Sequence, residues 1–257
     1  MEDTEKSIGD IFGLAPYGES LKIITEGGIE GISKFLDITC RPLLEELGLW
    51  ARDNLRVWRF KNLYNVLAKA EGKVTYQDGQ IMMVNPRLGY AIAENASLIE
   101  DEEIQNMWAG LFAASISSDG KDDSNLIFIN LLKQLTSVQA HMLRYAFDNC
   151  RKVKYDNGLI TGCKFSITSK EAYALFQIKD IDKLDRELDS LDSLGLINGG
   201  LSLEDKDLEV DLSLTSLGIY LISKCQGNSI VDYSNFITEQ EYKAHPEYHA
   251  GGYLAIE

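Results

Sequence analysis

The sequence contains few of the residues that interrupt helices. Its 257 residues include four prolines, at positions 16, 42, 86 and 246. Proline breaks helix interiors, because it has no N–H and its ring clashes with the preceding turn. The scarcity of proline therefore predicts long helices. A run of about 18 uncharged apolar residues is also lacking, which argues against a membrane-spanning helix.

Positive charge is scarce as well. The chain has 25 lysines and arginines against 40 aspartates and glutamates, which gives a net charge of −15. Non-specific binding to nucleic acid or to anionic lipid needs a positive potential, so neither DNA nor a membrane is an expected partner. Hydrophobic residues make up 45% of the chain, an ordinary share for a globular protein. The length suffices for one large domain or two small ones.

Cysteine is rare and scattered. The four cysteines, Cys40, Cys150, Cys163 and Cys225, show no spacing typical of metal ligands. We expect buried free thiols in a reducing cytosol. Residues 1–6 are acidic and polar, unlike a signal peptide, so the protein is predicted to be cytoplasmic.

Motifs of common enzymes are absent from the sequence, including the nucleophile elbow, the P-loop, the dinucleotide-binding glycines and the zinc HExxH pattern. His141 falls in a predicted apolar helix and is interpreted as a core histidine rather than a general base. Residues 117–125 lack the alternating aspartates of a calcium loop, and Pro246 keeps His245 and His249 off a common helix face. We therefore predict no catalytic residue, no cofactor and no metal site, and interpret the chain as not an enzyme.

The segment 99–115 has the strongest helical pattern in the chain. Four acids open it, where they suit the positive end of a helix dipole. Five large apolar residues then recur at helical spacing on one stripe: Ile104, Met107, Trp108, Leu111 and Phe112. This pattern predicts a buried central helix rather than an active site. Ser97 followed by Glu100 offers a capping box for an earlier helix start.

Residues 50–70 are predicted to form a helix that carries the one concentrated positive feature of the chain. Arg52, Arg56 and Arg59 recur at helical spacing, and arginine forks match phosphate and carboxylate groups. The functional interpretation is contact with an anion or an acidic partner. The alternatives are a solvated face or ion pairs with the chain's own acids. A preceding helix carries Gly27 and Gly31, a small-residue pair that favours close helix packing.

From residue 136 onward the order of predicted elements is informative. In chain order these are a helix over 138–147 capped by Thr136 or Ser137, an extended region over 153–167 with a turn at 156–158, a short helix capped by Thr168, a longer helix capped by Asp180, a hairpin over 201–214 and a helix capped by Thr215. Helix, strand, two helices, a two-stranded wing and a helix make a winged helix-turn-helix. Residues 180–211 hold eleven acids and three bases, so this module is expected to contact protein, because such a charge repels phosphate.

The predicted fold is therefore mainly α, in the α+β class. A helical domain over 1–125 is followed by a winged-helix-like domain with a short β wing over 126–226. Residues 227–257 are predicted to form a flexible or partner-docking tail.

Several phrases resemble one bacterial family. Residues 102–115, with acids followed by Trp108-Ala109-Gly110-Leu111-Phe112-Ala113, are similar to the Trp-centred core of the abortive-infection alpha proteins, and residues 127–136 resemble the segment that follows it. The resemblance covers about residues 75–150 and extends more loosely to 226 through the Leu-Gly-Leu-Ile and Leu-Thr-Ser-Leu-Gly phrases. A His-Pro-x-Phe phrase of the family is replaced by residues 124–128, and Ser137 stands where the family has proline.

This resemblance implies a bacterial cytoplasmic protein of phage defence, with no implied reaction. Our leading hypothesis is a non-enzymatic defence protein that acts through contacts with a phage or host protein, or with further copies of itself in a homo-oligomer. One alternative is a winged-helix transcriptional regulator. Another is a toxin that acts on a membrane or a nucleic acid through the Gly27/Gly31 helix or the arginine row.

Overall fold

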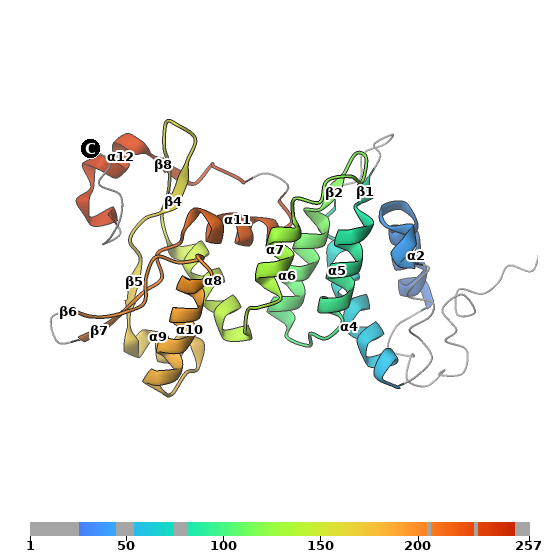
Figure 1. Cartoon of the computed structure of the whole chain (residues 1–257), viewed down its shortest axis with the longest axis horizontal. Coiled ribbons are helices and arrows are strands. Elements are labelled where there is room, and N and C mark those ends of the chain that lie inside the picture. Colours follow the sequence, from blue (N-terminus) through green and yellow to red (C-terminus); the bar gives the residue numbers. More distant parts are fainter. Residues whose placement is uncertain (1–25, 45–53, 75–81, 205–206, 229–230, 250–257) are drawn as a thin grey trace, which may run out of the picture. The chain divides into compact units, whose positions relative to one another are not determined.

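The structure is a computed structural model, and it describes residues 26–44, 54–74, 82–204, 207–228 and 231–249. These residues are mainly helical, with small sheets (Figure 1). The chain divides into two compact units: unit 1 comprises the described residues within Met1–Lys133 and Lys224–Ser229, and unit 2 those within Gln134–Ser223 and Ile230–Glu257. No helix among the described residues is long and apolar enough to cross a membrane.

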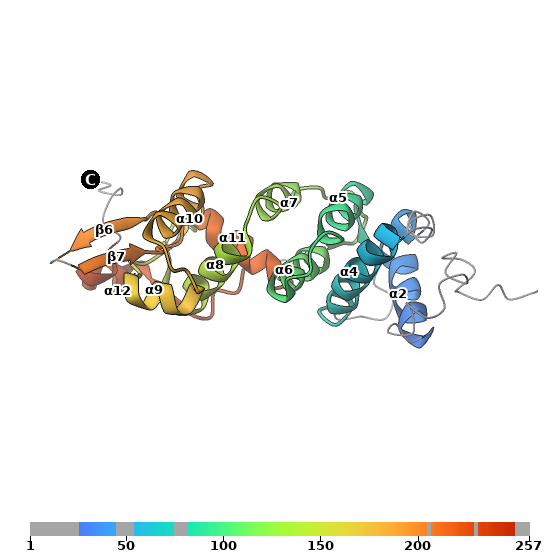
Figure 2. The same cartoon turned by 90° about the horizontal axis from the view of Figure 1, so that it is seen from below.

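Unit 1 is a set of packed helices with one two-stranded sheet. Its elements are α2 (Glu26–Thr39), α4 (Asn54–Glu71), β1 (Met83–Val84), α5 (Pro86–Ala96), α6 (Glu102–Ala113), β2 (Ile116–Ser117) and α7 (Leu126–Leu132). Helix α6 contacts α4, α5 and α7, and α4 also contacts α2. Figure 2 shows α2, α4 and α6 side by side. Strands β1 and β2 pair antiparallel.

Helix α6 is the buried central helix predicted from its apolar stripe. All five stripe residues are buried; Trp108 is 1% exposed and Phe112 is fully enclosed. The Phe112 ring meets that of Phe35 from α2 at 5.7 Å between centroids. The predicted start at Ser97 is wrong, because Asp101 caps the helix by accepting a 3.0 Å hydrogen bond from the Ile104 N–H. Ser97 instead ends α5.

Unit 2 combines five helices that the structure describes with two three-stranded sheets. Its elements are α8 (Ser137–Asn149), β3 (Lys152–Lys154), β4 (Ile160–Gly162), β5 (Ser166–Thr168), α9 (Ser169–Phe176), α10 (Ile181–Ser193), β6 (Leu201–Glu204), β7 (Asp207–Asp211), α11 (Ser216–Cys225), β8 (Phe236–Thr238), α12 (Glu239–Ala244) and the 3-10 helix η2 (Pro246–Tyr248). The last two residues of α11 are counted with unit 1. One sheet is antiparallel in the order β5-β7-β6, and the other has the order β4-β3-β8.

The helix starts predicted for unit 2 are confirmed. Thr136 and Gln139 form a capping box at α8, and Thr168 and Glu171 form one at α9. Asp180 caps α10 through the N–H of Asp182. In each case a short side chain just before the helix satisfies an N–H that lacks a helical partner. Local chemistry therefore defines these boundaries.

The structure divides the chain differently from the predicted domains. Helix α7, expected at the start of the second domain, belongs to unit 1 because it packs against α5 and α6. In the predicted tail, residues 231–249 belong to unit 2, since β8 pairs in parallel with β3. This pairing joins residues more than 80 positions apart, and no local pattern in the sequence indicates it.

Candidate functional site

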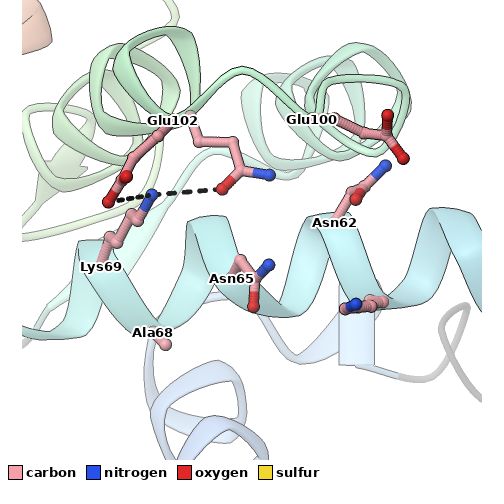
Figure 3. Close-up of a pocket in the computed structure, with 8 residues that line it drawn as sticks. Asn62, Asn65, Ala68, Lys69, Glu100 and Glu102 are labelled. Atoms are coloured by element: carbon pink, nitrogen blue, oxygen red, sulfur yellow. Dashed lines mark hydrogen bonds and ion pairs between the residues drawn. The ribbon is translucent and has the colours of Figure 1, made fainter. Parts of the chain in front are cut away.

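A polar groove lies between α4 and the start of α6 (Figure 3). We call it the α4–α6 groove. Its volume is about 530 Å³, and its lining residues are Lys61, Asn62, Asn65, Ala68, Lys69, Glu100, Glu102 and Gln105. This groove was not predicted from the sequence. One signal in the sequence was the pair of amides, Asn62 and Asn65, which stand among the apolar residues Leu63, Val66 and Leu67.

The groove face of α4 follows from helical spacing. Residues 61, 65, 68 and 69 recur at the 3.6-residue period on one side of the helix, whereas Leu63, Val66 and Leu67 are buried on the other. This wall of the groove is polar because the apolar residues of α4 pack into the core on the other side of the helix.

Two buried amides hold the wall opposite α4. The Asn62 Nδ2 donates to the Ser97 carbonyl at 3.1 Å, and the Gln105 Nε2 donates to the Ile99 carbonyl at 2.8 Å. These bonds fix the connection between α5 and α6. The Lys69 Nζ donates to the Gln105 Oε1 at 3.2 Å and lies 3.8 Å from the Glu102 Oε1. Because Glu102 is mostly exposed, this ion pair contributes little stability.

The remaining polar groups of the groove can contact a ligand or partner. Neither Lys61 nor Asn65 makes a hydrogen bond or ion pair with a residue that the structure describes. A free ammonium and a free amide can bind carboxylate, carbonyl or hydroxyl groups. The lysines, amides and carboxylates of the lining suit polar binding.

The arginine row is described in part. Arg52 lies outside the described residues, and Arg56 lies in α4. The Arg59 Nε donates to the Ser97 Oγ at 3.0 Å, and its guanidinium also reaches the Glu94 carbonyl at 3.4 Å. Arg59 thus fastens α4 to the end of α5. The predicted contact between this row and an anion or acidic partner stays a prediction.

Helix α10 presents an acidic surface in unit 2. Leu184, Leu188 and Leu191 are fully buried on one side. The opposite side exposes four aspartates, and two bases lie among them: Asp182, Asp185, Asp189, Asp192, Lys183 and Arg186. We call these four aspartates the α10 acidic face. Glu187 points elsewhere: its carboxylate accepts from the Thr136 Oγ1 at 2.9 Å and ties α10 to the start of α8.

The interpretation of His141 as a core residue is wrong, because its side chain is exposed on α8. The buried face of α8 consists of Gln139, Met142, Leu143 and Ala146 at helical spacing, together with Ala140. The polar residue Gln139 can be buried because it forms the hydrogen bonds of the capping box with Thr136. Among the described residues, no group of three His, Cys, Asp or Glu side chains is arranged to hold a metal ion.

The four cysteines are buried free thiols, as predicted. Burial raises the pKa of Cys150 to about 11 and that of Cys163 to about 12. Both thiols are therefore protonated at neutral pH. Since the thiolate is the nucleophilic form of cysteine, neither group is suited to attack a substrate.

Two sequence phrases that lie twenty residues apart meet in unit 2. The Thr215 Oγ1 donates to the Gly195 carbonyl at 2.6 Å, and the Thr215 N–H donates to the Leu196 carbonyl at 3.1 Å. Ile197 and Leu214 form a bridge beside them. The Leu-Gly-Leu-Ile and Leu-Thr-Ser-Leu-Gly phrases are thus the two sides of one junction at the base of the β6–β7 hairpin.

These features define a mainly helical protein with small sheets, whose described surface groups suit binding. The chain belongs to the abortive infection alpha family, whose family model matches residues 60–225. The match includes α6 and the β6–β7 junction, and it connects the chain with abortive infection, a bacterial defence against phage. No curated protein and no solved structure shows significant similarity to the chain.

Proposed function

We propose that this chain is a cytoplasmic, non-enzymatic phage-defence protein that acts through protein–protein contacts of unit 2. Family membership supports the role in defence. Four buried free thiols are typical of a reducing compartment. The partner in this proposal is a phage or host protein with a basic surface.

Unit 2 is interpreted as a winged helix-turn-helix. In support, α8, β5, α9, α10, the β6–β7 hairpin and α11 occur in the order of that motif, with β3 and β4 between α8 and β5, and β5, β7 and β6 form one antiparallel sheet. In DNA-binding members of this architecture the second helix of the pair enters the major groove. In this chain α10 is the second helix of that pair.

The α10 acidic face is the observation that carries the proposal. Its four exposed aspartates would repel the phosphates that a DNA-reading helix must contact. The same charges attract a basic protein surface and speed its approach. An exposed acidic helix in the position of a reading helix therefore favours protein recognition over the alternative of a transcriptional regulator.

The test removes the negative charge of the α10 acidic face and keeps α10 folded. A variant with Asp182, Asp185, Asp189 and Asp192 all replaced by Asn should lose protection in plaque assays with a phage panel. The matched control replaces the same four residues by Glu, which keeps the charge and should keep protection. Circular dichroism of both variants checks the fold. Full protection by the Asn variant would overturn the proposal, and salt-dependent DNA binding by the native chain would favour a regulator.

A further inference from the structure

The C-terminal segment 231–249 covers an edge of β3. Strand β8 pairs with β3 in parallel over three residue pairs, Lys152 with Phe236, Val153 with Ile237 and Lys154 with Thr238. Since β4 occupies the other side of β3, the described segment supplies the third strand of this sheet. The Lys164 N–H donates to the Tyr248 carbonyl at 2.7 Å, which ties the far end of the segment to the chain after β4.

Most of the remaining contacts are polar or aromatic. The Lys154 Nζ lies 4.2 Å from the centre of the Tyr233 ring, and the Arg151 guanidinium lies 4.9 Å from that of Tyr248 and donates to its hydroxyl. The rings of Tyr155 and Tyr242 meet edge to face. The Asp156 N–H donates to Glu239 at 3.0 Å, and Tyr233 also hydrogen-bonds Tyr220 of α11.

These contacts hold the segment weakly. None of the residues 232–249 is buried, and Val231 alone among the described residues of the segment is buried. Hydrophobic burial, the main source of stability in folded proteins, therefore adds little here. An exposed cation–π pair is worth about 0.5–1 kcal/mol. Segments with few buried contacts open at a small free-energy cost.

The chain reaches this segment from outside unit 2. Residues 224–228 belong to unit 1, and the described segment that begins at Val231 belongs to unit 2. Within unit 1 the start of this stretch is held in place, because the Cys225 carbonyl lies directly against Gly110 of α6. Release of the segment therefore leaves both α11 and its anchor in place.

We propose that the edge of β3 is a self-association surface, at which the segment 231–249 of a second copy replaces the chain's own. The second copy presents the same sequence and makes the same contacts in the same register. Exchange of an identical element is a low-cost route to a dimer. Only the higher effective concentration of the chain's own segment favours the closed monomer, so high protein concentration favours exchange.

Two single-cysteine variants test this exchange in the full chain. Lys154 and Thr238 are exposed register partners. K154C chains that carry an added size tag and untagged T238C chains are mixed, incubated at high concentration and oxidised, and non-reducing electrophoresis then separates the heterodimer from the two homodimers. Exchange brings the two new cysteines together and yields a disulfide-linked heterodimer. The matched control pairs T238C with K170C, because Lys170 is exposed on α9 away from the register.

The expected result is a heterodimer in the K154C and T238C mixture that the control mixture lacks. Adding I237P to both chains should abolish it, because proline removes a strand N–H; circular dichroism confirms that these chains are folded. Equal yields in the test and control mixtures would overturn the proposal. The readout is independent of phage protection, so its failure is distinct from a failure of the proposed function.

Discussion

Gly110 of α6 lies directly against the carbonyl group of Cys225. A Cβ placed on Gly110 would lie 1.7 Å from the Cys225 oxygen and 2.9 Å from the Gly227 nitrogen. Both neighbours are backbone atoms, so no side-chain rotation relieves the clash. A glycine at position 110 thus allows α6 to meet the end of α11.

The substitution G110A should therefore destabilise unit 1. Overpacking of a fixed contact costs about 1–3 kcal/mol and occasionally more, and we expect the upper part of this range. Urea unfolding measures it. The matched control is G72A, where a Cβ would make ordinary contacts at 3.6 Å or more, and its effect should lie within about 0.5 kcal/mol. Equal effects of the two substitutions would contradict the prediction.

Arg59 should contribute to stability and not merely to surface charge. It bonds to Ser97 and to the Glu94 carbonyl, and a hydrogen bond from a charged group contributes about 1.5–3 kcal/mol. We expect R59A to lower the unfolding free energy by about 1–2 kcal/mol, because part of the contact is exposed. If the arginine row is a partner contact, R52A combined with R56A should reduce phage protection at unchanged stability. Full protection by that double variant would argue against the partner contact.

The buried thiols should resist modification in the folded state. Burial raises the pKa of Cys150 to about 11 and of Cys163 to about 12, so the thiolate is a very small fraction at pH 8. We expect slow reaction of the native chain with a thiol reagent such as DTNB, and fast reaction of all four cysteines in guanidinium chloride. Rapid modification of Cys150 or Cys163 in the native chain, located by peptide mapping, would show that this region opens.

Acid should weaken unit 2 through its helix caps. Hydrogen bonds from Thr168 lower the pKa of Glu171, and those from Thr238 lower the pKa of Glu241. A carboxyl whose pKa is lower in the folded state stabilises the fold above its unfolded pKa, and this stabilisation is lost as the pH falls through the folded pKa. The melting temperature should therefore fall as the pH is lowered from about 5 to about 3.

The variant pair T168A and T238A provides the control for this acid effect. Each change removes the hydroxyl that caps a helix, which costs about 1 kcal/mol at neutral pH. It also removes one hydrogen bond that lowers the glutamate pKa. The double variant should thus lose less stability on acidification than the native chain. A parallel pH dependence of the two proteins would assign the acid effect to other carboxylates.

The fold could be predicted from the sequence where the determining interactions are local. Thr168 and Glu171 lie three residues apart, so their capping box can be identified without any tertiary contact. The stripe around Trp108 repeats at the helical period, and the structure buries it as that period predicts. At Ser97 the same reasoning failed, because Asp101 offers a better cap to α6 and the Ser97 hydroxyl accepts from Arg59.

Long-range contacts were not predictable from one sequence. The α4–α6 groove requires Lys69 to meet Glu102, and the β3–β8 pairing requires Val153 to meet Ile237. Nothing at Gly110 indicates Cys225 as its neighbour. In each case the packing of whole helices and strands determines which residues meet. Neither the periodicity nor the spacing of residues in a single sequence indicates that packing.

The junction between Thr215 and Gly195 has a consequence for where this chain can be lengthened. It closes the chain at the base of the β6–β7 hairpin with side-chain and backbone hydrogen bonds, while Gly218 packs against the Leu196 carbonyl. The helices on either side are therefore joined to each other independently of the hairpin. We expect an insertion in the β6–β7 hairpin to leave α10 and α11 in place. The β6–β7 hairpin is thus a natural insertion site for a reporter peptide.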